Sequence, residues 1–372
     1  MFIKKDLRKI PKILEDAVDC STNDGDDEAD DIMMANDENG ANNKHNNNEA
    51  PDAKRTKVLE PLKELRLSRR FQEFQGTVQI LCQPEFAPKL TQLKSLNLYD
   101  CQISNVEGLG DMFATASPNL ETLNLGRNPL STIPDDFAKM KSLKNIWMDD
   151  CQLNGPLPKA LMELPQLESL RLPHNNITEI VLLEDTVDTF DSELLSQPNL
   201  KLLCLDRNSI TDLPKKMKDW VPNLEELLVR HNRLERLGTN VLPSTLRILH
   251  ISSNQLTNLD DILHWKHPES NDAPLSHCPR LTHIYANSNQ LTHIPEGFVT
   301  CHSQLQRLVL SHNPPLRQLP QEIWDVLEQN DEGASTACEI LWQPNPNIQR
   351  PGTSPDEETG DSNDDTMAID QD

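Results

Sequence analysis

The stretch LETLNLGRNPLSTIP at residues 120–134 decides the fold. Its leucines and its asparagine follow the spacing L-x-x-L-x-L-x-x-N-x-L, and Ile133-Pro134 comes directly after them. The alternation around Leu123 and Leu125 predicts a short strand, because successive side chains of a strand point to opposite faces. One such unit cannot bury its leucines alone, so the pattern predicts a stack of similar units.

The same pattern recurs along most of the chain. Successive copies start at leucines separated by 27, 23, 24, 33, 24, 22, 35 and 24 residues. These leucines are Leu93, Leu120, Leu143, Leu167, Leu200, Leu224, Leu246, Leu281 and Leu305. A weaker copy at Leu62, with Arg70 in place of the asparagine, precedes them, and a closing copy is predicted around Ile340 and Asn345. The sequence therefore predicts ten to eleven repeats.

One position of each copy carries a polar residue that the spacing places inside the stack. It is an asparagine in most copies and a cysteine in two of them. The residues are Asn128, Asn175, Asn208, Asn232, Asn254, Asn289 and Asn313, with Cys101 and Cys151 as the two exceptions. A buried amide must have hydrogen-bond partners, and the turn backbone of neighbouring repeats can provide them. We therefore predict a structural role for this position.

Residues 62–348 resemble the intracellular leucine-rich repeat family. The turns that end in L-x-x-[LI]-P are similar to those of its Ras-signalling scaffold and plant-type members, and CQLNGPLPKAL at 151–161 resembles the plant-type variant. The predicted fold is an α/β solenoid. It is a horseshoe with a concave parallel β-sheet and a convex side of short helices and irregular turns. The resemblance implies a scaffold or adaptor that binds protein on its concave face.

The remainder of the chain divides by composition into segments that flank the repeats. We predict a basic amphipathic segment at 1–14, a disordered acidic and Asn-rich linker at 15–57, the repeat domain at 58–348 and a disordered acidic tail at 349–372, because the polar segments hold too few apolar side chains to form a core. Segment 1–14 is expected to dock on or cap the repeats. An unstructured leader and contact with an anionic membrane are the alternatives.

Composition limits the cellular location and the classes of ligand. The formal net charge of −24 and the pI near 4.8 disfavour nucleic acid. No apolar run approaches the roughly 18 residues that cross a bilayer, and the start MFIKKDLRKI lacks the apolar core of a secretion signal. Eight cysteines without a C-x-x-C pair fit reduced thiols. We expect a cytoplasmic protein that does not insert into membranes, with a nuclear location as the alternative.

Motifs of enzyme chemistry are absent from the sequence. It contains no phosphate-binding loop, no H-E-x-x-H, no G-x-S-x-G and no set of kinase motifs. We therefore predict no enzyme, no catalytic residues, no cofactor and no metal. His264-x-x-His267 with His277-Cys278 could be drawn as a zinc site, but the irregular spacing in the 261–280 insertion favours a surface loop.

Repeat geometry also predicts which side chains point outward from the sheet. The central outward positions are Arg66, Asn97, Asn124, Trp147, Arg171, Cys204, Leu228, His250, Tyr285 and Val309. Tryptophan and arginine are enriched at protein interfaces, so this face is the predicted binding surface. The predicted protein-binding residues are Asn145, Trp147, Asp149, Arg171, His174, Asp206, Arg207, Arg230, His231, His250, Tyr285 and Arg307. The alternative is a solvated polar sheet, or a Trp147 covered by the N-terminal segment or the 181–196 insertion.

These observations predict a monomeric, non-enzymatic scaffold or adaptor that binds an unidentified protein on its concave face. The alternative is a regulatory subunit or inhibitor of an enzyme such as a phosphatase or a small GTPase. A nuclear, histone-binding acidic repeat protein is a weaker third hypothesis, because longer and purely acidic tails are expected of that class.

Overall fold

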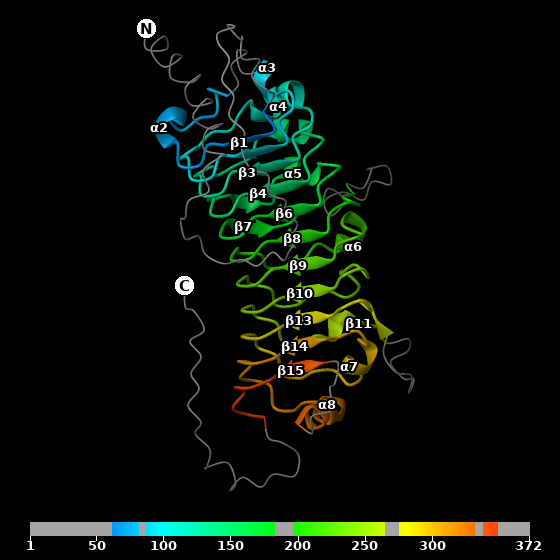
Figure 1. Cartoon of the computed structure of the whole chain (residues 1–372). Coiled ribbons are helices and arrows are strands. Elements are labelled where there is room, and N and C mark those ends of the chain that lie inside the picture. The colour runs from blue at the N-terminus through cyan, green and yellow to red at the C-terminus, as the bar shows by residue number, and fades with distance from the viewer. Residues whose placement is uncertain (1–61, 82–86, 183–195, 265–274, 332–337, 349–372) are drawn as a thin grey trace, which may run out of the picture.

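The computed structural model describes residues 62–81, 87–182, 196–264, 275–331 and 338–348. An 11-stranded parallel sheet runs through these residues in the order β1-β2-β3-β4-β6-β8-β9-β10-β13-β14-β15. Its strands are β1 Glu64–Arg66, β2 Ser95–Asn97, β3 Thr122–Asn124, β4 Asn145–Trp147, β6 Ser169–Arg171, β8 Leu202–Cys204, β9 Glu226–Leu228, β10 Ile248–His250, β13 His283–Tyr285, β14 Arg307–Val309 and β15 Glu339–Leu341. Figure 1 shows them stacked in chain order, which confirms the predicted solenoid.

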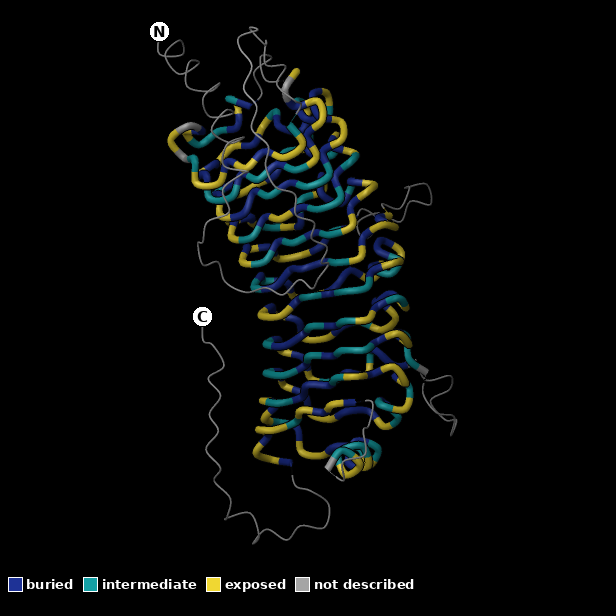
Figure 2. The backbone as a smooth tube through the Cα atoms, viewed as in Figure 1, coloured by how far each residue is buried: buried dark blue, intermediate teal, exposed yellow. Residues whose placement is uncertain are grey.

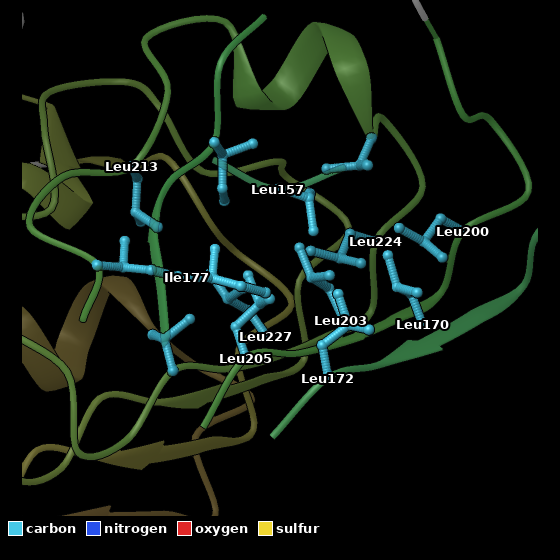
Figure 3. Close-up of a cluster of buried hydrophobic side chains, with 14 of the residues drawn as sticks. Leu157, Leu170, Leu172, Ile177, Leu200, Leu203, Leu205, Leu213, Leu224 and Leu227 are labelled. Atoms are coloured by element: carbon cyan, nitrogen blue, oxygen red, sulfur yellow. The ribbon is translucent and has the colours of Figure 1, made fainter. Parts of the chain in front are cut away.

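Each strand turns its middle residue into the core. Leu123 of β3 pairs with Leu96 of β2 and with Ile146 of β4, and all three side chains are fully buried. The same register continues to Ile340 of β15, which pairs with Leu308, so the predicted closing repeat is present. Figure 3 shows how leucines of successive repeats, such as Leu170, Leu203 and Leu227, pack on one another. Within the described residues, the core is thus one continuous column.

Short helices form the side of the stack opposite the sheet. They are α2 Phe71–Phe74, α3 Ala87–Leu90, α4 Leu109–Ala116, η2 Asp135–Lys139, α5 Lys159–Met162, α6 Met217–Trp220, η4 Asp260–Ile262, α7 Phe298–Cys301 and α8 Gln321–Asp331. Prolines precede three of them, Pro134 before η2, Pro158 before α5 and Pro320 before α8, where a helix has no need of the missing N–H. Figure 2 shows that buried and exposed residues alternate along the turns of the stack.

Two smaller sheets extend individual repeats. The plant-type phrase contains β5 Asn154–Pro156, which pairs in parallel with β7 Asn176–Glu179. In the 261–280 insertion, β11 Leu263–His264 and β12 Leu275–Ser276 pair as an antiparallel ladder. The surface-loop prediction for this insertion is wrong at its ends, because Ile262 and Cys278 lie fully buried in the core.

The polar ladder position is buried and satisfied as predicted. Asn128 accepts hydrogen bonds from the N–H groups of Cys101 (3.0 Å) and Ile103 (2.9 Å). Its amide nitrogen donates to the carbonyls of Leu98 and Leu125, both at 2.8 Å. One side chain therefore joins two consecutive repeats.

Several predictions fall on residues that the structure does not describe. The segments 1–14 and 15–57, the tail 349–372 and most of the 181–196 insertion lie outside the described residues, and so does His267. The proposed covering of Trp147 by these segments therefore stays a prediction, as do the boundaries of the repeat domain. In the described part of the chain, no cluster of three or more His, Cys, Asp or Glu side chains could hold a metal ion.

Asn232→Leu tests the ladder. The asparagine accepts a hydrogen bond from Ile210 N at 3.0 Å and donates to Leu205 O at 2.9 Å and Val229 O at 3.1 Å. Leucine leaves the Ile210 N–H without this acceptor, at roughly 1 to 3 kcal/mol. Leu205 O and Val229 O each lose one of two hydrogen bonds, because they also accept from Asn208 and Asn254. We expect urea unfolding to show a loss of at least about 1 to 3 kcal/mol, the cost of one unsatisfied buried group.

Asn223→Leu is the matched control, since this exposed asparagine makes one hydrogen bond, to Pro198 O. Its unfolding midpoint should stay close to that of the wild type. Equal midpoints for both variants would contradict the structural role of the ladder.

Candidate functional site

The central outward positions of the sheet form one continuous row. Pairing aligns Asn124 with Trp147, Trp147 with Arg171, and Arg171 with Cys204. The row continues from Cys204 through Leu228, His250, Tyr285 and Val309 to Leu341. The order read from the sequence is therefore the order of the side chains across the face, with Leu341 as one further member.

The first part of the face is centred on Trp147 of β4. Its side chain is 38% exposed, and Trp147 and Leu341 are the two exposed large hydrophobic residues among those the structure describes. Asn145 lies on the same strand and contacts the Thr122 hydroxyl at 3.4 Å. An exposed tryptophan on a pleated sheet, with polar groups beside it, is the usual composition of a binding hot spot.

Asp149 leaves β4 on the same side as Trp147 and packs over Gly126. A Cβ at Gly126 would lie 2.3 Å from Asp149 Oδ1, so only glycine leaves room for the carboxylate in this position. Burial raises the pKa of Asp149, and the nearby Arg127 opposes the rise. Arg127 in turn lies over the Tyr99 ring, at 5.7 Å from its centroid. Tyr99, Gly126 and Arg127 were not among the predicted site residues, although they occupy the exit positions of the same repeat pattern.

An ion pair lies at the centre of the face. It joins Asp206, two residues after the end of β8, to Arg230, two residues after the end of β9. The Asp206 carboxylate accepts hydrogen bonds from both the backbone N–H and the Nε of Arg230, each at 2.8 Å. Asp206 is buried, whereas the Arg230 side chain is 44% exposed. Both oxygens of Asp206 are used to orient Arg230, and the contact of Asp206 with a partner stays a prediction. Asp206 is a positioning residue.

Basic side chains surround this ion pair. The exit positions His174, Arg207 and His231 all have left-handed backbones, with φ of 55°, 52° and 53°. Burial lowers the pKa of His231, and the charges of Arg207 and Arg230 lower it further. His231 is therefore mostly neutral near pH 7, and the positive charge of this region comes from its arginines.

Cys204 lies between Arg171 and Leu228 in the central row and is 7% exposed. Burial raises the pKa of its thiol to about 12. A thiol with such a pKa stays protonated at neutral pH and is a poor nucleophile. Together with Leu228 it gives the middle of the row an apolar character.

Aromatic rings form the next part of the face. The His250 and Tyr285 rings lie with centroids 4.7 Å apart, and the His283 ring stacks on Tyr285 at 6.3 Å. Burial lowers the pKa of His250 to about 4, so this ring is neutral at pH 7. Arg307 on β14 pairs with Glu339 on β15, with Nε and Oε2 3.4 Å apart.

The structure thus brings the predicted residues together in three groups along one face. The first group is Asn145, Trp147 and Asp149; the second is Arg171, His174, Asp206, Arg207, Arg230 and His231; the third is His250 and Tyr285. Arg307 lies one strand beyond the third group and is paired with Glu339. In addition, Leu202 and Ile248 occupy first outward positions on β8 and β10 and add apolar area that was not predicted.

Asp206→Asn tests the ion pair. Asparagine removes the charge that holds Arg230, and a hydrogen bond to a charged group contributes roughly 1.5 to 3 kcal/mol. We expect a loss of unfolding free energy of about this size in urea titrations. Glu226→Gln on the same face is the control, because the Glu226 side chain makes no hydrogen bond or ion pair within the described residues. This variant removes an acidic charge and should leave the unfolding midpoint unchanged. An unchanged free energy of unfolding for Asp206→Asn would contradict the positioning role.

His250 should make the stability depend on pH. Its pKa is lowered from 6.5 to about 4 by burial, so the unfolded chain binds a proton that the folded chain does not bind between these values. Stability is therefore complete above pH 6.5 and falls as the pH drops toward 4. Relative to His250→Gln, the wild type should lose about 2 kcal/mol between pH 7 and pH 5 in urea titrations. His312→Gln, at an exposed exit position, is the control; parallel curves for all three proteins would rule out this titration.

No helix in the described ranges combines the length and the apolar character that a membrane span requires. The face contains polar, charged and aromatic side chains on a rigid sheet, and its one buried thiol is unreactive. What this arrangement can do is bind a surface of complementary shape and charge.

Comparison with known proteins agrees with this geometry. A leucine rich repeat family model matches residues 91–153. Osteomodulin of Bos taurus is 26% identical over 244 residues, which are 54% of this chain and 54% of osteomodulin. Keratocan of Mus musculus is 26% identical over 249 residues, or 59% of this chain and 67% of keratocan. Tubulin-folding cofactor E of Arabidopsis thaliana is 31% identical over 154 residues, or 41% of this chain and 28% of that protein.

Among solved structures, the chain is similar to a TLR13–ssRNA13 complex, with a TM-score of 0.51 and 20% sequence identity. The match covers 76% of this chain and 36% of the other, and at this identity it shows the fold alone. The chain thus spans about half of osteomodulin's length and about a quarter of tubulin-folding cofactor E. These matches support the repeat class, and the intracellular assignment stays a prediction from the sequence.

Proposed function

The chain belongs to the leucine-rich repeat proteins, and on this premise we propose that it is a non-enzymatic scaffold or adaptor that binds a partner protein on its concave face. The observation that carries the proposal is Trp147, a large aromatic residue that is 38% exposed on the rigid sheet. Burying such a side chain against a partner removes a large apolar area from water. The charged groups beside it supply specificity.

The composition of the rest of the face supports the same proposal. From Trp147 to Tyr285 the central row consists of apolar and aromatic side chains with one charged group, Arg171, among them. Interfaces with proteins are enriched in tryptophan, tyrosine and arginine. A face used only for solvation does not need these residue types, which makes a protein partner the better explanation.

A cytoplasmic location is part of the proposal. The six described cysteines form no disulfide, and four of them have thiols whose pKa is raised by burial to between about 11 and about 12. Buried thiols of this kind serve as small apolar side chains and need no oxidising compartment. Regulation of an enzyme is one way in which such an adaptor would act, and it uses the same face.

The double variant Trp147→Ala with Arg171→Ala tests the proposed face. Both side chains point away from the core, so the melting temperature should change little. Two truncations at a hot spot remove several kcal/mol of binding free energy, at about 2 kcal/mol or more each. We expect partners captured from a cell extract by the wild-type protein to be lost with the variant, as measured by quantitative mass spectrometry.

The control variant is Lys215→Ala with Glu235→Ala, which changes two exposed residues outside the sheet. It should capture the same proteins as the wild type. The single variant Trp147→Ala is measured beside it to separate the aromatic contact from the charge. Normal capture by the double variant would show that binding does not use this face.

A further inference from the structure

Arg171 differs from three other arginines of the sheet face, each of which pairs with a carboxylate. Arg66 pairs with Glu64, Arg230 with Asp206 and Arg307 with Glu339. Arg171 makes no ion pair in the part of the chain that the structure describes. Its Nε, like that of Arg307, is buried without a hydrogen-bond partner, but Arg307 has the Glu339 carboxylate 3.4 Å away and Arg171 has no such compensating charge. A buried donor without a partner is costly, so a ligand that accepts its hydrogen bond gains binding free energy.

The neighbours of Arg171 explain why it has no partner. In register, it lies between Trp147 and Cys204, and neither of them carries a charge. The one carboxylate of the second group is Asp206, whose two oxygens are both bound by Arg230. Arg171 therefore contributes an uncompensated positive charge at the centre of the face, although the whole chain has a net charge of −24.

We propose that Arg171 is the centre of a carboxylate-binding subsite, which receives an acidic side chain of an extended partner segment lying across the strands between Trp147 and Tyr285. The inference rests on the proposed function and adds the chemistry of the partner. Arginine binds carboxylates in a planar, two-point geometry, and such charge-assisted bonds are about twice as strong as neutral ones. Arg230, which Asp206 holds in place, adds a second cation nearby.

The spacing of the strands determines how such a segment would be arranged. Neighbouring strands lie about 4.8 Å apart, so one strand step separates Trp147 from Arg171 by about 5 Å. Four further steps, through β8, β9 and β10 to β13, bring the row to Tyr285. The row from Trp147 to Tyr285 is then about 24 Å long, which an extended chain covers in about seven residues. The segment needs an apolar residue at each end and an acid close to one end.

The experiment uses the full chain and two synthetic peptides. The acidic probe is Leu-Glu-Glu-Ser-Gly-Ser-Gly-Leu, and its control replaces both glutamates by glutamine; each is also made in the reverse order, because the segment can run in either direction. Isothermal titration calorimetry measures the dissociation constants. We expect the acidic peptide, in one of the two orders, to bind about tenfold more tightly than its glutamine counterpart. High salt should reduce this preference.

Variants of the protein test whether Arg171 causes the preference for the glutamate peptide. Arg171→Gln should abolish the preference for glutamate and keep the melting temperature, because the side chain makes no ion pair in the described structure. Arg307→Gln is the matched control on the same face, and it should keep the preference. Equal binding of both peptides, binding of neither, or an equal effect of the two variants would overturn the subsite. Selective binding of a peptide with phosphoserine in place of glutamate would overturn the choice of a carboxylate.

The two proposals fail in different ways. If Trp147→Ala loses captured partners while glutamate and glutamine peptides bind alike, the face binds a protein but has no carboxylate subsite. If Trp147→Ala captures the same partners as the wild type, the proposed function itself is wrong, whatever the peptides do.

Discussion

The buried amide of the ladder asparagine is the interaction on which the rest of the structure depends. At Asn175, the carbonyl oxygen accepts from the N–H groups of Cys151 and Leu153, while the nitrogen donates to Met148 O and Leu172 O. Each amide thus binds the backbone of its own repeat to that of the previous one. Because the hydrogen bonds have fixed geometry, they hold the strands in register, and every outward side chain falls into a row. A binding face that extends over many repeats is possible only with this alignment.

The ladder position can hold cysteine in place of asparagine, because the donor role and the acceptor role of the amide can be taken by different groups. The Cys151 thiol keeps the donor role and bonds to Leu125 O at 3.2 Å. A thiol is a weak acceptor, and the acceptor role passes to the backbone: the carbonyl of Cys151 receives the N–H of Leu130 at 3.0 Å. Cys101 similarly donates to Leu67 O at 2.9 Å. The substitution occurs in repeats near the start of the sheet, and the column continues through it without a change of register.

The sequence allowed the fold and the central row to be predicted because both depend on local spacing. The leucine period specifies strand, core position and outward position together, so the sequence orders Trp147 next to Arg171 correctly. Burial on the outward face could not be predicted, since it depends on which side chain a neighbouring strand presents. Asp206 is buried because Arg230 lies beside it, and Asp149 packs closely because its neighbour is glycine. Cys278 was misassigned for a related reason: its insertion looks polar, yet its end re-enters the core.

The net charge of the chain and the local charge of Arg171 act at different stages of binding. A chain with a net charge of −24 repels an acidic partner that has approached to within about a Debye length, about 8 to 10 Å, because the charges are largely screened at greater distances. Arg171 acts only at contact, where the apolar neighbours Trp147 and Cys204 strengthen its attraction by excluding water. An acidic protein without complementary apolar side chains would therefore be rejected, because it meets the repulsion without gaining the contact. Selection then depends on the combination of apolar and acidic groups at the right spacing, which a rigid row of side chains is suited to measure.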